Sequence, residues 1–282
     1  MAIVTGASRG VGKGIALGLG EAGATVYVTG RTVQEGSAPW PGTIGATAEA
    51  VSALGGQGVA VRCDHRDDAA IAALFAQVQA EQDRLDVLVN NVYSLPGLET
   101  PRDVPFWELP LDVWDHIHTV GLRAHFVASR HAAPIMIAQG AARQVASSRT
   151  RDTGSAPARR AESVAGLIVN VSSAGGARYL FNAAYGAAKA ALERLAADMA
   201  HELRPHGVAA LSIRPSMVAT ERTKTTPHLW TNRATPGEVQ SPRFAGRAVA
   251  ALAADSNVLA KTGQALEVAD LAAEYGFTDP DD

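Results

Sequence analysis

The sequence lacks several features, and each absence excludes a class of protein. It has one cysteine, Cys63, so an internal disulfide is excluded, and we expect a reducing compartment, the cytoplasm. The stretch Met1 to Gly6 has no basic segment and no long apolar run, so we expect no signal peptide. No apolar run reaches the about 18 residues of a membrane span. A net charge of −3 argues against nucleic acid or an anionic membrane as the main partner.

Metal-binding patterns and internal repeats are also missing. The eight histidines include His116 and His118, but no spacing is typical of a zinc or iron site, so we predict no metal centre. Hydrophobic residues make up 47% and charged residues 19% of the chain, which suits a well-buried globular core.

Short apolar strands alternate with helices along the chain. The predicted strands are 2–5, 25–29, 59–63, 86–90, 167–171, 208–213 and 264–268. The predicted helices lie before Gly23 and at 44–54, 67–82, 111–138, 182–203 and 241–254, the last begun by Ser241-Pro242. Continuously apolar strands indicate a parallel sheet covered on both faces. We therefore predict an α/β, Rossmann-type, doubly wound parallel sheet of about seven strands, in a single domain over 1–282.

Residues 140–165 differ in composition from the rest of the chain. They are rich in Ala, Ser and Arg and have almost no large apolar side chains, so we predict a mobile insertion. A nucleic-acid-binding arm is the alternative. The insertion joins a helix end to a strand start, which places it at the sheet edge opposite the strand ends that bind ligands.

A glycine-rich loop follows the first strand and opens the first helix. Glycines at Gly6, Gly10 and Gly12 let the backbone approach a pyrophosphate, and a helix N-terminus offers unpaired N–H groups. The spacing is Gly-x-x-x-Gly-x-Gly, which differs from the generic dinucleotide fingerprint. The loop predicts a dinucleotide site; a turn without a ligand is the alternative.

Charged residues at the strand ends indicate which dinucleotide. Arg31 stands where an acidic residue normally holds a ribose 2′-hydroxyl, and Arg9 lies in the glycine loop. Two guanidiniums suit a 2′-phosphate, so NADPH is favoured over NADH, with two solvated arginines as the alternative. Asp64 closes the third strand, where it is placed to accept from an adenine amino group or to cap a helix.

Tyr185 and Lys189 are four residues apart, so on a helix they lie one turn apart on one face. An ammonium beside a phenol favours phenolate and lowers the pKa of the tyrosine. Such a tyrosine can give a proton to a carbonyl or take one from an alcohol. An exposed helical lysine below a packed tyrosine is the alternative reading of this pair.

Four motifs, taken together, resemble the short-chain dehydrogenase/reductase family over nearly the whole chain. They are Thr5-Gly6-Ala7-Ser8-Arg9-Gly10-Val11-Gly12, Asn90-Asn91, Ser172-Ser173 and Tyr185-Gly186-Ala187-Ala188-Lys189. Within the family, Asn90-Asn91-Val92-Tyr93, Val120-Gly121-Leu122-Arg123, Tyr179-Leu180-Phe181-Asn182 and Asp270-Leu271-Ala272 are similar to the subgroup of SDR family member 1. That subgroup implies NADPH-dependent carbonyl reductases of broad substrate range, steroids included.

The resemblance also implies roles for individual residues. Tyr185 would be the acid/base, Lys189 would lower its pKa and bind the nicotinamide ribose, and Ser173 would hydrogen-bond the substrate oxygen. Ser172 remains a rival, because the gap from Ser173 to Tyr185 is one residue shorter than usual. The cofactor would be held by Gly6, Ser8, Arg9, Gly10, Val11 and Gly12 of the loop, by Arg31 and Asp64, by Asn90 on the adenosine side, and by Val218 and Thr220 at the carboxamide.

Two positions depart from the family pattern. The family usually has an Asn seven residues after the Trp of the long helix, whereas Trp114 here leads to Gly121. Glycine still supplies the backbone carbonyl that holds a water leading to the lysine, at a helix cost of about 1 kcal/mol, so the proton relay is in question. Ser216 follows Pro215 in place of the usual Gly and adopts φ > 0 less freely.

These observations predict an oxidoreductase that transfers a hydride between NADP(H) and a carbonyl or secondary alcohol. The alternative is a dinucleotide-binding sensor or scaffold with little catalysis; a double-bond reductase is a weaker rival. We expect a small, apolar substrate. Phe106, Trp107 and Trp230 either wall its pocket or pack elsewhere. The resemblance implies a homodimer or homotetramer through the helices at 111–138 and 182–204.

Overall fold

The computed structural model describes residues 1–94, 104–149, 164–225 and 239–280. Seven parallel strands form one sheet in the order β3-β2-β1-β4-β5-β6-β9. The strands are β1 (Ala2–Val4), β2 (Thr25–Gly30), β3 (Gln57–Arg62), β4 (Val87–Asn90), β5 (Gly166–Val171), β6 (Val208–Arg214) and β9 (Ala265–Glu267). The chain proceeds outward from β1 in one direction and from β4 in the other. The predicted Rossmann-type sheet is confirmed, and its direction switches between β1 and β4.

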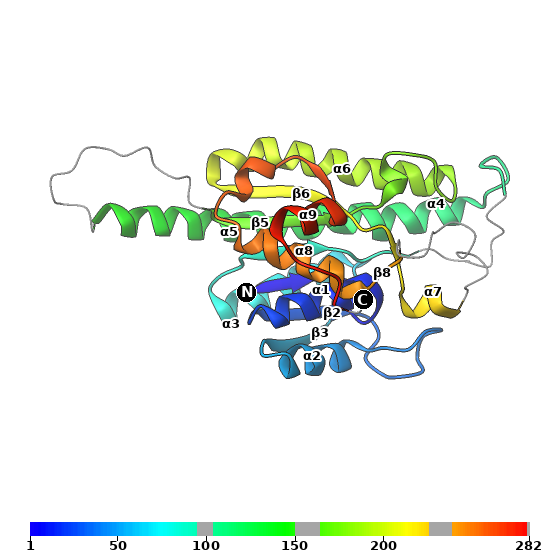
Figure 1. Cartoon of the computed structure of the whole chain (residues 1–282), viewed down its shortest axis with the longest axis horizontal. Coiled ribbons are helices and arrows are strands. Elements are labelled where there is room, and N and C mark those ends of the chain that lie inside the picture. Colours follow the sequence, from blue (N-terminus) through cyan, green and yellow to red (C-terminus); the bar gives the residue numbers. More distant parts are fainter. Residues whose placement is uncertain (95–103, 150–163, 226–238, 281–282) are drawn as a thin grey trace.

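Helices cover both faces of the sheet (Figure 1). One face carries α1 (Gly10–Glu21), α2 (Ile44–Ala53) and α8 (Pro242–Ala254), and the other carries α3 (Asp68–Gln82), α5 (Ala124–Arg149) and α6 (Ala183–Leu203). Neighbouring strand residues point to opposite cores: Val4 packs with the first group and Ile3 with the second. Continuous apolar runs therefore bury both sides of each central strand.

The N-termini of two helices are fixed by side-chain caps. The Asn182 side chain accepts a hydrogen bond from the Tyr185 backbone N–H at 2.9 Å, which fixes the start of α6 and places Tyr185 one turn before Lys189. Ser241 caps α8 through the Phe244 N–H, with Pro242 in the first turn, as the Ser-Pro pair predicted.

The long helix predicted at 111–138 is interrupted and extended. It consists of α4 (Leu111–His118), a π-helical segment η1 (Thr119–Arg123) around Gly121, and α5. A single π turn widens the helix locally at Gly121.

The predicted insertion at 140–165 has different limits. Helix α5 runs through 140–149, because an alanine-rich stretch favours helix without large apolar side chains. Arg143 donates to the Val164 carbonyl and pairs with Asp86, and Ala165 is buried. Mobility over 140–149 and at Ala165 is therefore not what the structure shows, and residues 150–163 lie outside the described part.

Four short strands and α-helices of the described residues were not predicted. The two-residue strands β7 (Met217–Val218) and β8 (Val239–Gln240) pair with each other, and α7 (Glu221–Thr225) lies between them in the chain. Helix α9 (Val268–Tyr275) follows β9 without a loop and packs on the α8 face. In Figure 1, α7 and the C-terminal end of α5 lie at opposite ends of the molecule. No helix among the residues described is long and apolar enough to cross a membrane.

Two histidines are buried near the carboxyl edge of the sheet. His65 Nε2 lies 2.9 Å from Thr29 Oγ1, and His125 Nε2 donates to the Val92 carbonyl at 2.8 Å. Burial lowers the pKa of His65 to about 4 and that of His125 to about 3. Both imidazoles are therefore neutral near pH 7.

Acid should destabilise the protein through these two histidines. Both folded-state pKa values lie below the unfolded value of about 6.5, so between roughly pH 4 and 6.5 the unfolded chain binds more protons. Stability should therefore fall as pH drops through this window, by on the order of 3 kcal/mol for each histidine. Thermal unfolding at pH 7, 5.5 and 4 should show a smaller loss in His125→Gln than in the exposed-site control His201→Gln. Equal losses in the two variants would contradict this origin of acid sensitivity.

Candidate active site

Two cavities meet at the carboxyl edge of the sheet. The glycine-loop cavity, about 340 Å³, is lined by Gly6 to Gly12, Arg31, Asp64 and residues of α7. The tyrosine cavity, about 610 Å³, is lined by Ser173, Tyr185, Lys189 and the segments 178–181 and 215–218. Both are lined by Val11, Asn91, Tyr93 and Thr220. A molecule spanning both would therefore lie across the switch point of the sheet.

The glycine loop has the backbone that close approach to an anion requires. Gly6 and Gly10 adopt left-handed φ values of +66° and +61°, and a Cβ on Gly12 would lie 2.3 Å from Asn91 Nδ2. Helix α1 begins at Gly10, so its first N–H groups face the cavity. The residues present therefore fit the diphosphate of a dinucleotide.

A carboxylate of this chain already contacts that helix terminus. The Gly10 N–H donates to Glu221 Oε2 on α7 at 2.7 Å, and the next residue, Arg222, stacks over Trp40 at 5.3 Å. Trp40, Glu221 and Arg222 all line the glycine-loop cavity. Because Glu221 occupies a donor suited to a phosphate, a dinucleotide and this carboxylate compete for the same N–H.

The two asparagines of the Asn90-Asn91 pair lie in different environments. Asn90 is fully buried, and its amide donates to Ser129 and Asn170; it lines neither cavity. The expected contact of its side chain with the adenosine side is therefore not formed. Asn91 lines both cavities and donates to the carbonyls of Thr5 and Gly6, so it braces the glycine loop. Sequence order alone does not distinguish the inward from the outward asparagine.

Arg9 and Arg31, the two arginines expected to bind a 2′-phosphate, differ in how their side chains are held. Arg9 is held by the carbonyls of Pro41 and Gly42, at 3.0 and 2.6 Å. Arg31 is exposed, and among the described residues no hydrogen bond or ion pair of its side chain is found. Of the predicted arginine pair, Arg31 therefore offers the open guanidinium.

Asp64 lines the glycine-loop cavity but is not a helix cap. Its carboxylate pairs with Arg66 at 2.7 Å, and that hydrogen bond lowers its pKa to about 2. Asp67 caps α3 instead. The alternative of a capping role for Asp64 is therefore wrong, and its carboxylate is ionised near neutral pH.

The residues of the tyrosine cavity form one hydrogen-bonded group. Tyr185 hydroxyl donates to Ser173 Oγ at 2.7 Å, and Ser173 Oγ also accepts from the Gly175 N–H at 3.1 Å. Lys189 Nζ donates to the Val171 carbonyl at 2.9 Å. Tyr185 and Lys189 are only 8% and 6% exposed, so the alternative of an exposed lysine is wrong.

The geometry also separates the two serines. Ser172 is buried, and its hydroxyl donates to Glu193 Oε1 at 2.7 Å. Glu193 in turn holds Arg214 through two hydrogen bonds. Ser172 thus belongs to a network behind the site, whereas Ser173 faces Tyr185 and its O–H remains to donate into the cavity.

Burial dominates the ionisation of the pair. It raises the pKa of Tyr185, against the hydrogen bond with Ser173 and the charge of Arg222. It lowers the pKa of Lys189 to about 8, against the charge of Glu193. In the protein alone, the pKa of Tyr185 therefore moves opposite to the predicted direction, because desolvation outweighs the neighbouring charges.

The walls of the tyrosine cavity come partly from unexpected residues. Phe181 has a left-handed φ of +65° and places its ring edge-on to Tyr185, with centroids 4.9 Å apart. Phe106 and Trp107 are exposed and line neither cavity, and Trp230 lies outside the described residues. The sequence clue that Phe181 lines this cavity was its position directly before the helix cap Asn182.

The opposite wall is formed after β6. Val218 is buried against the tyrosine cavity, and Thr220 lines both cavities. Ser216 has no left-handed φ, and its N–H donates to Gln240 at 3.1 Å. The Pro-Ser turn is therefore built without the conformation that glycine would favour.

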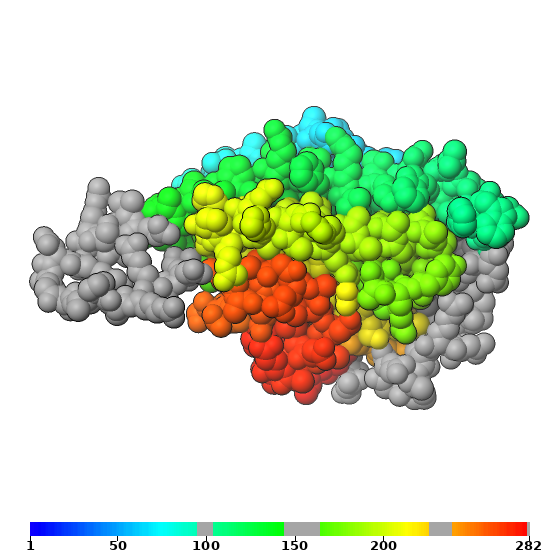
Figure 2. Space-filling view, turned by 90° about the horizontal axis from the view of Figure 1, so that it is seen from above, coloured from blue at the N-terminus to red at the C-terminus, as the bar shows by residue number. Residues whose placement is uncertain are grey.

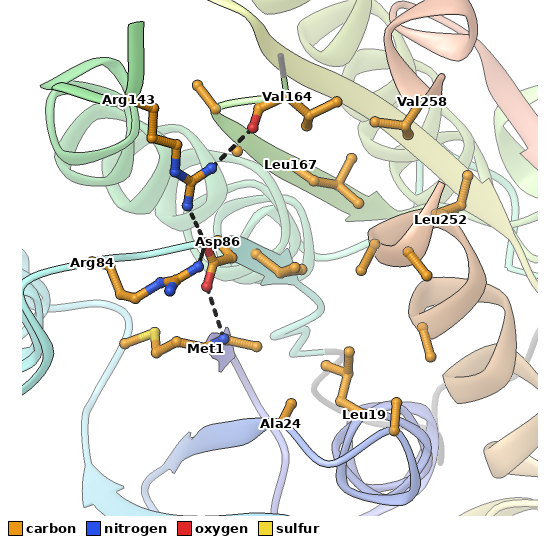
Figure 3. Close-up of a pocket in the computed structure, with 18 residues that line it drawn as sticks. Met1, Leu19, Ala24, Arg84, Asp86, Arg143, Val164, Leu167, Leu252 and Val258 are labelled. Carbon is orange, nitrogen blue, oxygen red and sulfur yellow. Dashed lines mark hydrogen bonds and ion pairs between the residues drawn. The ribbon is translucent and has the colours of Figure 1, made fainter. Parts of the chain in front are cut away.

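A further cavity of about 410 Å³ lies at the amino edge of the sheet. Figure 3 shows Arg84, Arg143 and the amino group of Met1 converging on Asp86 beside apolar side chains such as Leu167. Its lining contains neither the glycine loop nor the tyrosine group, so it is separate from the candidate active site.

Comparison with known proteins agrees with this geometry. The short chain dehydrogenase family model matches residues 1–158 and 153–229. Dehydrogenase/reductase SDR family member 1 of Mus musculus is 41% identical and that of Homo sapiens 40% identical, each over 99% of this chain and 82% of the relative. A crystal structure from Beutenbergia cavernae, described as an NAD(P)-dependent gluconate 5-dehydrogenase with bound NADP at low occupancy, has a TM-score of 0.72 and 28% identity. The alignment with that structure covers 95% of this chain and 94% of the other.

A family match over most of the chain and two relatives that align with 99% of this chain decide the assignment. The chain belongs to the short-chain dehydrogenase/reductase family, in the subgroup of SDR family member 1, and is an NAD(P)-dependent oxidoreductase.

Proposed function

We propose that the protein transfers a hydride between NADP(H) and a carbonyl or secondary alcohol, with Tyr185 as general acid/base. The observation that carries the proposal is the 2.7 Å hydrogen bond between Tyr185 and Ser173, beside the buried Lys189, in a cavity continuous in its lining with the glycine-loop cavity. Proton donor, hydroxyl donor and cation converge where a substrate oxygen would lie.

The nicotinamide, when bound, supplies or accepts the hydride. In the reducing direction, Tyr185 gives its phenolic proton to the substrate oxygen. For this the phenolic O–H turns from Ser173 Oγ to the substrate oxygen, and Ser173, whose Oγ still accepts from the Gly175 N–H, donates its own O–H to the same oxygen. The charge of Lys189 stabilises the phenolate that remains. In the oxidising direction, the phenolate takes the alcohol proton back.

Replacing the phenol should abolish turnover. Tyr185→Phe keeps the ring packed against Phe181 but removes the proton, so kcat for carbonyl reduction should fall at least about 10²-fold. The assay is NADPH oxidation against a panel of ketones and aldehydes, with NADPH affinity measured in parallel by fluorescence. Unchanged affinity with lost turnover supports the assignment. If the wild-type protein binds NADPH but reduces no member of the panel, the result instead favours a dinucleotide-binding sensor or scaffold.

The two serines should differ in their kinetic effects. Ser173→Ala removes a donor to the substrate oxygen, so kcat/KM should fall about 10²-fold. Ser172→Ala leaves Glu193 bonded to Arg214, so it should mainly lower the melting temperature, by a few degrees for about 1 kcal/mol. Steady-state kinetics and thermal unfolding of both variants provide the comparison; the reverse pattern would transfer the role to Ser172.

The cofactor we propose is NADPH, held by the glycine loop and by Arg31. What supports the choice is the exposed guanidinium of Arg31 beside the cavity, at the end of a strand that lacks an acidic residue there. A 2′-phosphate pairs well with a guanidinium, worth about 1.5–3 kcal/mol. Ser8, Arg9, Gly10 and Val11 line the same cavity and would contact the remaining phosphates and ribose.

Reversing the charge of Arg31 should reverse the preference. Arg31→Asp should raise KM for NADPH about 10-fold or more and lower that for NADH, since aspartate accepts from a free 2′-hydroxyl. The measurement is kcat/KM with each nucleotide on one substrate, and Arg62→Asp, on the neighbouring strand and outside the cavity, is the control. Equal kcat/KM for the two nucleotides in wild type, unaltered by Arg31→Asp, would remove the preference.

We further propose a small apolar substrate and a homo-oligomer. Leu180, Phe181 and Met217 line the substrate side, which supports an apolar ligand. A relative from Mediterraneibacter gnavus that is 30% identical is a 3beta-hydroxysteroid dehydrogenase, which favours the same class. Helices α4, α5 and α6 lie side by side on one face, as Figure 2 shows, and this face would carry the contact between copies.

A further inference from the structure

The absence of a side chain at Gly121 leaves space for the ring of Tyr93. A Cβ at this position would lie 2.9 and 3.1 Å from two ring carbons of Tyr93, closer than side-chain atoms normally approach. Gly121 is buried in the π-helical segment η1, and Tyr93 lies in the segment after β4. The absence of a side chain at 121 is therefore matched by the presence of a ring from another element.

The ring of Tyr93 covers the Lys189 ammonium. Lys189 Nζ lies 4.9 Å from the Tyr93 ring centroid, closer than the 5.9 Å to that of Tyr185. The two tyrosine rings meet edge-to-face with centroids 5.8 Å apart. A cation within about 6 Å of an aromatic centroid is attracted to the ring face, most strongly when it is desolvated.

Lys189 needs such a neighbour because little else compensates its charge. Among the described residues, its ammonium donates one hydrogen bond, to the Val171 carbonyl. Glu193 raises its pKa, but that carboxylate is already bonded to Arg214 and Ser172. An ammonium withdrawn from water and left with one carbonyl would favour its neutral form.

We propose that Tyr93 is a positioning residue of the active site, whose ring holds the Lys189 ammonium in place and charged, and that Gly121 is the glycine that admits this ring. The catalytic relevance of the pair rests on the proposed function, whereas the contact with Lys189 does not. The Tyr93 hydroxyl is buried and has no partner among the described residues, and Tyr93 lines both cavities. The hydroxyl is therefore left for a molecule bound where the cavities meet.

Other ionisable groups also affect the pKa values of Lys189, Tyr93 and Tyr185, so the test variants leave them unchanged. They are Glu193 and Tyr185 on α6, His125 on α5, and Arg222 on α7, which acts on both tyrosines. His125 stays neutral above about pH 4, so its charge does not change between pH 6 and 10, where Lys189 titrates.

The test follows the ionisation of Lys189 in the ligand-free protein. The chain has four lysines, so lysine labelled with ¹³C at the ε carbon gives few NMR signals, and Lys189→Met identifies the one required. In wild type the midpoint should lie near 8. Tyr93→Leu removes the ring yet keeps the site apolar, so the midpoint should fall by about one pH unit. Tyr93→Phe, the matched control, keeps the ring and should titrate within about 0.3 pH unit of wild type.

Gly121→Ala tests the same contact from the other side. Its Cβ should displace the ring and lower the Lys189 midpoint, whereas in the Tyr93→Leu background it should add nothing, because the ring is already gone. An unchanged midpoint in folded Tyr93→Leu, or equal effects of Gly121→Ala with and without the ring, overturns the proposal. The alkaline limb of the carbonyl-reduction profile should move with the NMR midpoint. If wild type reduces no carbonyl, the proposed function fails, and the titration still decides the role of Tyr93.

Discussion

The burial of the Lys189 ammonium is the constraint on which the rest of the candidate site depends. Desolvation alone would favour the neutral amine, and the lowered pKa of about 8 shows how near that balance lies. The Val171 carbonyl, the Tyr93 ring and the more distant Glu193 each act to keep the charge. The same burial also favours the neutral phenol of Tyr185, so the pKa of Tyr185 is raised whereas that of Lys189 is lowered. A phenol that keeps its proton beside an ammonium close to losing one is suited to giving a proton only when a substrate oxygen develops negative charge.

The fold supplies this site by bringing strand ends together, and it also places a competitor there. The loop after β6 delivers both Val218 to the tyrosine cavity and Glu221 to the first N–H of α1. Arg222, which is also on α7, stacks over the ring of Trp40 and so connects α7 to that residue. A diphosphate bound at the glycine loop would therefore compete with Glu221 for this N–H. Val218 on the wall of the tyrosine cavity and Glu221 lie three residues apart in one segment.

Sequence patterns predicted the elements better than the side-chain directions. Continuous apolar strands, the glycine loop and the Tyr185–Lys189 spacing led to the observed sheet and to the observed pair. Which asparagine of Asn90-Asn91 faces the cavity depends on strand register, and the ties of Arg9 to the 41–42 carbonyls depend on a loop that no periodicity describes. The sign of the Tyr185 pKa change required knowledge of burial, which competes with charge and cannot be read from spacing.

Gly121 shows that a departure from the family pattern can be misinterpreted when a position is considered without the residue that it contacts. Considered alone, a glycine where the family usually has an asparagine indicates a lost part of the proton relay. Considered with Tyr93, it is the space that an aromatic ring fills, because the two positions lie in contact although 28 residues separate them in the chain. The ring brings to Lys189 an attraction that does not depend on water. In this proposal, the departure from the family pattern replaces one means of holding the ammonium with another. The evidence is that the Tyr93 ring occupies the space that a Cβ at position 121 would need.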